Sequence, residues 1–452
     1  MNVIVVGCGK VGYALAETLC SENHDVTVID TNEDKIERIS NNLDVVGVRG
    51  NGASYRVLQE AGVEDCDVLI ACTSQDEVNM LCCLIARKAG KCRTIARVRD
   101  PNYYSEIGFI QEELGLSLCI NPELAAASAC YQLLRTPSAM ELDDFAKGQV
   151  EMITFDLPEN SPWLNKRLSD ITRESRFSFL STIVRRGQEV LIPNGSTVLK
   201  RGDRISVMLA THYATRILEM AGIRYKPVRR VMIAAGGNVG YYLAKKLCED
   251  RIDVTIVEPI RKRCDELNDL LPKANIIYGD ACNEKLLLEE HIDEMDAFLA
   301  LTGNDSENIM MGLFANRYCS GKLITRMNKV TMSDVLGNLP LGSVVSPKEL
   351  TAEKILSYVR AIDNKDPTNT MDAVYRLAGD QVEAVAFTVN APSPVTGRRL
   401  MDLPIRPGIV VCAIIHRNNV TIPSGQDSIQ TGDQVVLVTN RRGLRSLNDI
   451  LK

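Results

Sequence analysis

The sequence predicts an α/β protein that arose by tandem duplication. Each half is expected to hold a doubly wound parallel-sheet domain followed by a small α+β C-terminal subdomain. Three observations lead to this prediction. A glycine-rich turn follows a short apolar run near the start of each half, and the main motifs recur at a constant spacing. Each half also changes partway from alternating strand-like and helical segments to closely spaced strand-like runs.

The repeat is clearest around the two glycine-rich turns. VIVVGCGKVG (3–12) returns as VMIAAGGNVG (231–240), and DVTVID (25–30) returns as DVTIVE (253–258), both 228 residues later. TSQDEVNM then aligns with TGNDSENIM, and IPNG aligns with IPSG, each of which precedes a Gly-Asp pair. We infer one module of about 225 residues that occurs twice.

The change of character within each half predicts four domains. In roughly the first 130 residues of a half, β-branched runs such as NVIVVG and CDVLIACT alternate with helical stretches, as in a parallel sheet with crossover helices. Later runs such as EMITFDL and DRISVMLA are separated by turn residues, as in hairpins. We expect domains at 1–140, 141–225, 226–365 and 370–452, with linkers within 140–149, around Lys226-Pro227 and within 362–370.

The composition is that of an ordinary globular chain. Of 452 residues, 52 are Lys or Arg and 58 are Asp or Glu, which gives a net charge of −6 and argues against a disordered chain or a basic nucleic-acid-binding protein. No apolar run reaches the roughly 18 residues of a membrane-spanning helix, and the N-terminal apolar run is too short for a signal peptide. We expect a cytoplasmic protein. Its 14 cysteines form no CxxC pair, so we expect reduced, mostly buried thiols and no metal site.

The first glycine-rich turn predicts a Rossmann-like nucleotide site. It comprises Gly7, Cys8, Gly9, Lys10, Val11 and Gly12, and Asp30 ends the next strand. In such a turn the first glycine allows the bend, the second admits a diphosphate, and the third lets the helix pack on the strand. Asp30 is expected to accept hydrogen bonds from ribose hydroxyls, which favours NAD(H), ATP or ADP over NADP(H). The alternative is a vestigial turn that binds nothing.

The second turn departs from this pattern. Ala235 stands at the first glycine position, followed by Gly236, Gly237, Asn238, Val239 and Gly240, with Glu258 as the expected ribose acid. Asn238 replaces Lys10, so we expect no cation near this turn and two unequal sites. A degenerate structural site is the alternative.

Further candidate residues follow the later strands of the parallel sheets. Thr73, Ser74 and the equivalent Thr302 follow apolar strands, where ligands of open α/β sheets bind, although such residues also cap helices. Arg97 and Arg99 close the next strand and are candidates for phosphate contacts, with a solvated strand end as the alternative.

The sequence favours a binding protein over an enzyme. Only four histidines are present and none recurs in the repeat, so an acid–base constellation beside a nicotinamide is not evident. No GKS/T of a P-loop follows either turn. We expect the nucleotide to be sensed rather than consumed. The alternative is an NAD-dependent oxidoreductase with a duplicated Rossmann domain, and a third possibility is a nucleotide sensor for another process.

Together these motifs resemble the TrkA family of Trk-type potassium-uptake regulatory proteins, which are built from two RCK (KTN) modules. The resemblance rests on both glycine-rich turns, TSQDEVN and TGNDSEN, IARVRDP (95–101), and two C-terminal subdomains with IPxG and GD. It implies a homo-oligomeric cytoplasmic subunit, a dimer or tetramer ring, that lies peripherally under a membrane potassium-transporting partner. The subunit would gate this partner in response to NAD(H) and ATP or ADP.

The resemblance also implies roles for single residues. The first site would hold Gly7, Gly9, Lys10, Gly12, Asp30, Thr73, Ser74 and Arg97, and the second would hold Gly237, Gly240, Glu258 and Thr302. Arg99 would reach a terminal phosphate. Glu123 in INPE matches a position that lies near an intersubunit divalent-cation site in related modules.

Overall fold

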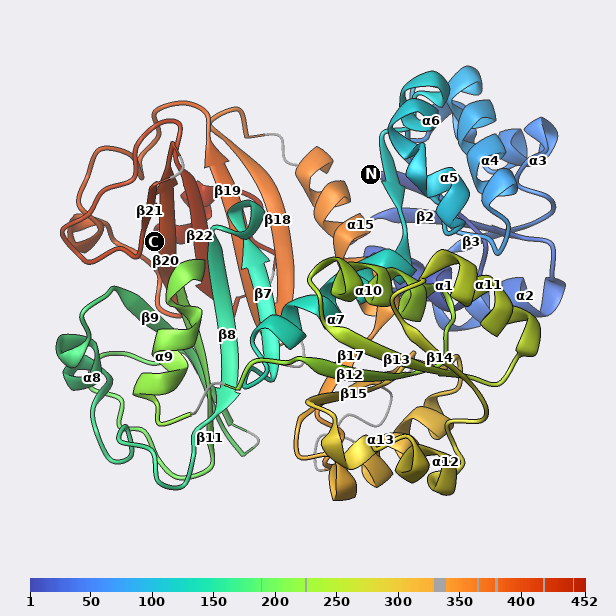
Figure 1. The fold of residues 1–452 in the computed structure, drawn as a ribbon. Coiled ribbons are helices and arrows are strands. Elements are labelled where there is room, and N and C mark those ends of the chain that lie inside the picture. The colour runs from blue at the N-terminus through green and yellow to red at the C-terminus, as the bar shows by residue number, and fades with distance from the viewer. Residues whose placement is uncertain are drawn as a thin grey trace. The chain divides into compact units, whose positions relative to one another are not determined.

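The computed structural model describes residues 1–187, 189–223, 226–328, 339–363, 366–378, 381–417, 419–441 and 443–452, with only the backbone of residue 147 (Figure 1). The chain divides into two compact units. The first contains residues 1–126 and 346–363, and the second contains residues 127–345 and 364–452. Within the described residues, no helix combines the length and apolar character needed to cross a membrane.

The first unit is built on a six-stranded parallel sheet with strand order β3-β2-β1-β4-β5-β6. Its strands are β1 (Asn2–Val6), β2 (Asp25–Asp30), β3 (Val46–Arg49), β4 (Val68–Ala71), β5 (Arg93–Arg97) and β6 (Leu118–Ile120). Its helices are α1 (Lys10–Ser21), α2 (Glu33–Asn42), α3 (Tyr55–Glu60), α4 (Asp76–Ala89), α5 (Pro101–Ser105), α6 (Ile107–Leu114) and α15 (Pro347–Asp363). This is the doubly wound order of a Rossmann-like domain, as predicted.

Strand residues alternate between two apolar layers that cover the faces of this sheet. Val3 and Val5 of β1 pack with α1 and α2, whereas Ile4 and Val6 pack with α3, α4 and α6. Helix α15, which comes more than 200 residues later in the chain, completes the first layer by packing on α1. Arg360 of α15 also forms an ion pair with Glu22.

The second unit contains a parallel sheet of the same order, β14-β13-β12-β15-β16-β17. Its strands are β12 (Arg230–Ala234), β13 (Asp253–Glu258), β14 (Asn275–Tyr278), β15 (Ala297–Ala300), β16 (Lys322–Arg326) and β17 (Ser343–Val345). Its helices are α10 (Asn238–Glu249), α11 (Arg261–Leu270), α12 (Glu284–Glu289) and α13 (Asp305–Tyr318). Helix α7 (Pro122–Arg135) starts in the first unit, and its residues from 127 onward belong to the second.

Two antiparallel sheets complete the second unit. One has the order β10-β9-β11-β8-β7 and the other β18-β19-β22-β20-β21, so equivalent strands occupy equivalent places. The first contains β7 (Glu141–Phe145), β8 (Val150–Asp156), β9 (Phe179–Arg186), β10 (Glu189–Leu191) and β11 (Asp203–Ala210), with helices α8 (Leu168–Glu174) and α9 (Ala214–Met220). The second contains β18 (Asn369–Leu377), β19 (Val382–Val389), β20 (Ile409–His416), β21 (Asn419–Thr421) and β22 (Gln434–Thr439).

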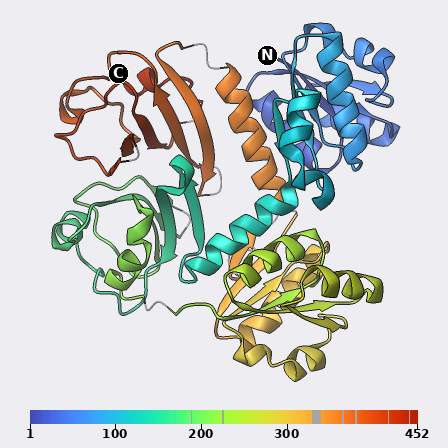
Figure 2. The ribbon, with the colours of Figure 1, turned by 45° about the horizontal axis from the view of Figure 1, so that its top comes forward.

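The two antiparallel sheets lie side by side and share one apolar core (Figure 2). Met152 and Met208 of the first sheet meet Cys412 and Val436 of the second in this core. The rings of Phe145 and Tyr375 lie 4.5 Å apart, edge to face. The tandem duplication expected from the sequence is therefore present in both the parallel and the antiparallel sheets.

The expected linker at 140–149 was wrong. Residues 141–145 form β7, which pairs with β8 along its length. The run ELDDF holds three acidic residues, but β7 lies at the edge of its sheet, where polar side chains are tolerated, and Phe145 packs in the shared core. Within the expected linker at 362–370, α15 ends at Asp363 and β18 begins at Asn369, while residues 364–365 lie outside the described chain.

The repeated Gly-Asp pair closes an equivalent turn in both antiparallel sheets. Gly202 and Gly432 have φ values of +81° and +91°. The buried carboxylate of Asp203 accepts hydrogen bonds from Arg186 at 2.8 Å and from the backbone N–H of Lys200 at 2.8 Å. The carboxylate of Asp433 bonds the N–H of Gln430 at 2.7 Å in the same way. The Gly-Asp motif thus has a structural role.

The cysteines form no disulfide. All fourteen cysteines of the chain are free, and twelve of them are buried.

The two glycine-rich turns have the same backbone conformation despite the substitution at their first position. Gly7 has a φ of +100° and Ala235 a φ of +82°. The N–H of each bonds the neighbouring strand, Gly7 to Ile29 at 2.7 Å and Ala235 to Val257 at 2.9 Å. A left-handed φ is unfavourable for alanine because its Cβ crowds the backbone. Ala235 is therefore held in a strained conformation by the surrounding sheet.

Replacing Ala235 by glycine should stabilise the second parallel-sheet domain by about 1 kcal/mol. The strain of a left-handed alanine is on the order of 1–2 kcal/mol, and the greater freedom of glycine in the unfolded chain offsets part of this gain. Hydrogen-exchange protection of the β12 and β13 amides in increasing urea measures the change. Gly7→Ala is the matched opposite variant and should lower protection in β1, because its Cβ would lie 2.9 Å from the nitrogen of Thr73. Unchanged protection in both variants would contradict this account.

A second prediction concerns Lys322, a buried lysine at the start of β16 whose ammonium donates a hydrogen bond to the carbonyl of Ala139. Burial lowers the pKa of Lys322 from 10.5 to about 8. Between these two values the unfolded chain binds more protons than the folded chain, so stability should rise with pH across this window and be independent of the Lys322 proton below about 8, where both states are protonated.

The Lys322→Met variant isolates this effect, because it keeps the length of the side chain without a titrating group. We expect wild type to gain stability relative to Lys322→Met between pH 8 and 10.5, measured as the difference in urea midpoints. Parallel pH profiles of the two proteins would contradict this prediction, because they would show that folding does not lower the pKa of Lys322.

Candidate nucleotide site

A cavity of about 410 Å³ lies at the carboxyl ends of the strands of the first parallel sheet. This position includes the boundary between β1 and β4, where the strand order reverses and where ligands of doubly wound sheets bind. Six residues predicted from the sequence line the cavity: Gly7, Gly9, Asp30, Thr73, Ser74 and Arg97. Thus the structure brings together residues from the glycine-rich turn, the end of β2, and the segments after β4 and β5.

Gly9 lines the cavity with its backbone uncovered by side chains. Its backbone is extended, with φ −73° and ψ −169°, a conformation open to any residue. A Cβ built at Gly9 would meet no protein atom within 4 Å, so the fold does not require glycine there. At Gly12, in contrast, a Cβ would lie 1.9 Å from the carbonyl oxygen of Gly7, so this glycine serves helix packing. The space above Gly9 fits the approach of a diphosphate to the backbone.

Asp30 has contacts on both carboxylate oxygens. Oδ2 accepts a hydrogen bond from the backbone N–H of Cys8 at 2.7 Å, and Oδ1 accepts one from the N–H of Asn32 at 2.9 Å. Lys35 lies 3.6 Å from Oδ2. The acid therefore ties the glycine-rich turn to the end of β2. Each oxygen keeps further acceptor capacity for a ribose hydroxyl.

Several predicted residues lie beside the cavity rather than in its wall. Cys8 and Val11 are buried in the apolar layer under α1, and Lys10 is exposed as the first residue of that helix. Arg99 points to Glu123, with Nε 2.9 Å from Oε1. These four residues do not line the cavity, and the roles in nucleotide binding that were predicted for them stay predictions.

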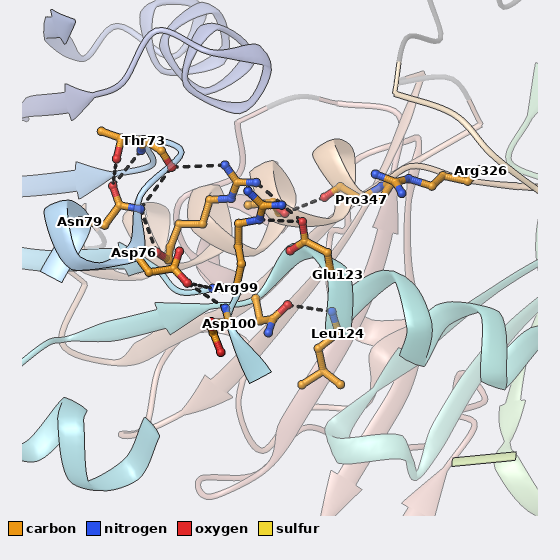
Figure 3. Close-up of polar contacts among 12 residues, drawn as sticks. Thr73, Asp76, Asn79, Arg99, Asp100, Glu123, Leu124, Arg326 and Pro347 are labelled. Carbon is orange, nitrogen blue, oxygen red and sulfur yellow. Dashed lines mark hydrogen bonds and ion pairs between the residues drawn. The ribbon is translucent and has the colours of Figure 1, made fainter. Parts of the chain in front are cut away.

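The spacing of Thr73, Asp76 and Asn79, which recurs in the second half, has a structural explanation (Figure 3). The Asn79 amide oxygen accepts hydrogen bonds from the Thr73 N–H at 2.8 Å and hydroxyl at 2.7 Å, and its nitrogen donates to the carbonyl of Arg97 at 2.9 Å. The carboxylate of Asp76 accepts from the N–H groups of Arg99 and Asp100 at 2.7 and 2.8 Å. These side chains join the ends of β4 and β5 and fix the cavity edge.

Arg97 and Arg99 share one carboxylate (Figure 3). Arg97 Nη2 lies 3.8 Å from Oε1 of Glu123, the same oxygen that Arg99 contacts. Glu123 Oε2 is buried without a hydrogen-bond partner, as is Nε of Arg97. Burial, then the charge of Arg99, lowers the pKa of Arg97. Because Arg97 and Arg99 share the charge of Glu123, that carboxylate neutralises Arg97 only in part, which leaves Arg97 able to attract an anion in the cavity. No group of three or more metal-ligating side chains occurs within the described chain.

Sequence reasoning missed part of the cavity wall. The further lining residues are Val6, Ile29, Thr31, Lys35, Gly50, Asn51, Gly52, Cys72, Gln75 and Val78. The GNG turn after β3 was a visible signal, since it follows the third strand of a sheet whose carboxyl ends form the site. Lys35 follows Asp30 by five residues, in the first turns of α2.

The second glycine-rich turn repeats the hydrogen bonds of the first. Glu258, only 4% exposed, accepts from the N–H of Gly236 at 2.8 Å and of Ile260 at 3.0 Å. A Cβ at Gly237 would meet no atom within 4 Å, as at Gly9, whereas a Cβ at Gly240 would lie 2.4 Å from the carbonyl oxygen of Ala235. Asn238 and Val239 begin α10.

The expectation that no cation lies near the second turn was wrong. Arg263 donates from Nε to the carbonyl of Gly236 at 2.9 Å and pairs with Glu266 at 2.9 Å. It comes from the first turn of α11, at the place of Lys35 in the first half. Thr302 bonds Asn308 as Thr73 bonds Asn79, with 2.9 Å between the hydroxyl and the amide oxygen. The two turns thus share their geometry and differ in their charged groups.

The titratable groups in the first cavity suit binding better than chemistry. Its lining contains no histidine, and its ionisable side chains are those of Asp30, Lys35, Cys72 and Arg97. Burial raises the pKa of the Cys72 thiol to about 12, so it stays protonated and is a poor nucleophile. These residues can hold phosphate and ribose groups through charge and hydrogen bonds.

Comparison with known proteins places the chain in a family. The model of the TrkA-N domain matches residues 3–122 and 231–347, and that of the TrkA-C domain matches 152–220 and 384–452. The Trk system potassium uptake protein TrkA of Halomonas elongata is 31% identical over 457 residues, covering 100% of this chain and 99% of that protein. A TrkA homolog of Archaeoglobus fulgidus is 31% identical over 453 residues, covering 100% of both chains.

Solved structures share the fold at lower identity. The GsuK channel bound to NAD is 18% identical with a TM-score of 0.63, covering 97% of this chain and 76% of that one. The GsuK RCK domain is 17% identical with a TM-score of 0.64, covering 97% and 92%. The domain models match most of the chain and the relatives align over its whole length, so the resemblance seen in the motifs is confirmed: this chain belongs to the TrkA family of Trk-system potassium uptake proteins.

Proposed function

We propose that this chain is a cytoplasmic regulatory subunit of a Trk-type potassium uptake system that binds NAD(H), ATP or ADP. In this proposal it gates a membrane potassium-transporting partner. The observation that carries the nucleotide part is the open space above Gly9, in a cavity that also holds Asp30 and Arg97. The names of its full-length relatives support the link to potassium uptake.

The residues of the first cavity suit the parts of a dinucleotide or nucleoside phosphate. The turn at Gly7 and Gly9, with the N-terminus of α1 behind it, offers backbone N–H groups and a partial positive charge to a diphosphate. Asp30 would accept from ribose hydroxyls, and its charge disfavours a 2′-phosphate. Arg97 would meet a phosphate, with Thr73 and Ser74 beside it. The phosphates of a bound nucleotide would add negative charge beside Lys35 and Arg97.

The second site is proposed to bind more weakly or with another preference. It keeps the open position at Gly237 and the acid Glu258, but Ala235 is strained and Arg263 is tied to the turn carbonyl. A ligand there would have to accommodate or displace this guanidinium. Unequal sites would let one chain respond to two nucleotides.

Signalling rather than turnover is the role that the cavity supports. A general acid or base beside a nicotinamide is expected of an oxidoreductase, and the lining offers no histidine for it. Ligand binding at a sheet edge can change an equilibrium by coupling of about 1–3 kcal/mol, which is roughly 5- to 150-fold. We therefore propose a non-enzymatic regulator, rather than the NAD-dependent oxidoreductase considered above.

Its assembly is also a proposal. The boundaries 1–140, 141–225, 226–365 and 370–452 would each delimit one domain, and a homo-oligomeric dimer or tetramer ring would present these domains to the partner at the inner face of the membrane. The relatives named as Trk-system proteins and the channel fold neighbours support such a partner. No nucleic acid is involved in this proposal.

The Gly9→Ala variant tests the nucleotide site. Its new methyl group enters open space, so the fold should be unaffected, whereas a diphosphate could no longer approach the turn. Calorimetric titration with NADH, NAD, ATP and ADP should show affinity lowered by about tenfold or more, equivalent to about 1.4 kcal/mol. Asp30→Ala should also weaken binding, while Glu258→Ala reports on the second site.

Gly108→Ala is the matched control, since a Cβ at Gly108 in α6 also meets nothing within 4 Å but lies outside the cavity. Binding to wild type without turnover, lost in Gly9→Ala and kept in Gly108→Ala, supports the proposal. Turnover of any nucleotide would favour the oxidoreductase or another enzyme, and absence of binding would mean that the turns are relics.

Glu123→Gln tests whether Arg97 faces a phosphate. Removal of the carboxylate leaves Arg97 and Arg99 less neutralised, so affinity for ATP should rise by about 5-fold, while adenosine, which has no phosphate, should bind as in wild type. The control is Glu77→Gln, which also removes one carboxylate. Glu77 is exposed and accepts a hydrogen bond from the hydroxyl of Tyr103, and it does not pair with Arg97 or Arg99. Unchanged or weaker ATP binding in folded Glu123→Gln would show that Arg97 does not meet the phosphates.

A further inference from the structure

A second cavity, of about 370 Å³, lies within the second unit, at the far end of α10 from the glycine-rich turn. Its wall combines the C-terminal half of α7, residues of β7 and β8, the segment after β11, and the end of α10. This volume falls in the range of about 300–1,000 Å³ found for small-molecule sites. Nothing in the nucleotide proposal uses this cavity.

Glu151 places a buried carboxyl group in the wall. It lies in β8 and is 7% exposed, and its Oε2 has no hydrogen-bond partner. Strand pairing sets it opposite Asp144 of β7, so two acidic side chains are neighbours. Burial, then Asp144, raises the pKa of Glu151 to about 7, and Arg135 acts in the opposite direction. A buried carboxylate without a partner is unfavourable unless a positive group meets it.

Arg135 places a positive charge in the same wall. It is the last residue of α7, and its guanidinium forms no hydrogen bond with any residue that the structure describes. A guanidinium stays charged and offers a planar fork of donors that matches a carboxylate. His212 also lines the cavity. The site thus holds, on one element, a buried acid with one oxygen that lacks a hydrogen-bond partner, and, on another, an arginine whose guanidinium makes no hydrogen bond to the described residues.

The rest of the wall combines polar groups, among them Gln132, Thr136 and Asp250, with an apolar part. Leu142, Leu247 and Ile252 contribute side chains from β7, the end of α10 and the segment after it. A simple cation would leave the guanidinium of Arg135 without a hydrogen-bond partner, and a simple anion would leave Oε2 of Glu151 without one. A molecule with both charges and an apolar tail would match all three features.

We propose that this cavity binds a small zwitterion, an α-amino acid with an apolar side chain. Its ammonium group meets Glu151, its carboxylate meets Arg135, and its side chain contacts the apolar wall. Because the ligand would bridge α7 and β8, it would hold these two elements together.

Titration calorimetry of the full chain with L-alanine, L-valine, L-leucine, L-isoleucine, L-methionine and L-phenylalanine tests the proposal. At least one should bind saturably with one site per chain. For leucine, the matched halves are isoamylamine, which lacks the carboxylate, and 4-methylpentanoate, which lacks the ammonium group. Each half should bind about tenfold or more weakly, because one charge-assisted hydrogen bond is lost.

Two variants assign the charges. Glu151→Gln and Arg135→Gln should each weaken amino-acid binding by about tenfold, whereas Arg216→Gln, which alters an exposed arginine of α9 outside the cavity, should not. The proposal is overturned if none of the six amino acids binds, if either half binds as well as the zwitterion, or if folded Glu151→Gln binds like wild type. Should a variant fail to fold, the comparison of leucine with its two halves on the wild-type chain decides.

Discussion

The amide side chain of Asn79 holds the carboxyl ends of two neighbouring strands together, and the shape of the candidate nucleotide cavity depends on this contact. Its oxygen binds Thr73 after β4, and its nitrogen binds the carbonyl of Arg97 at the end of β5. Asn308 makes the same bonds to Thr302 and Arg326 in the second sheet. A buried amide that is fully bonded fixes the backbone on both sides, so the lining residues keep their spacing without a ligand.

In the two glycine-rich turns, the residues that the fold requires can be distinguished from those that it does not require. Asp30 and Glu258 each hold the N–H of their turn, so an acid at this position stabilises the turn whether or not a ribose is bound. Gly12 and Gly240 likewise serve packing. Within the two turns, Gly9 and Gly237 are the glycines whose Cβ would meet no protein atom within 4 Å, so variants at these positions test ligand binding more directly than variants of the acids do.

Much of this arrangement could be predicted from the sequence, because repeated motifs and a strand–turn–helix pattern depend on local chemistry. The order of the parallel strands, the turn at Gly7 and the place of Asp30 follow from such patterns. Arg263 could not be placed, since its contact with Gly236 depends on the path of a long side chain. β7 was missed because its acidic run has no apolar alternation, whereas its strand conformation comes from pairing with β8 and from the burial of Phe145 in the shared core.

Helix α15 has a consequence for the order in which the protein matures on the ribosome. Ala352, Ile355, Leu356 and Val359 fill the apolar layer over α1, yet they are synthesised long after β6 has completed the first sheet. At about 5–20 residues per second, this delay is on the order of tens of seconds. During that time part of the apolar layer beside α1 stays exposed, and exposed apolar surface of this kind is what chaperones protect. The two halves therefore cannot fold completely one after the other, because the apolar layer of the first sheet is completed by a helix from the second half.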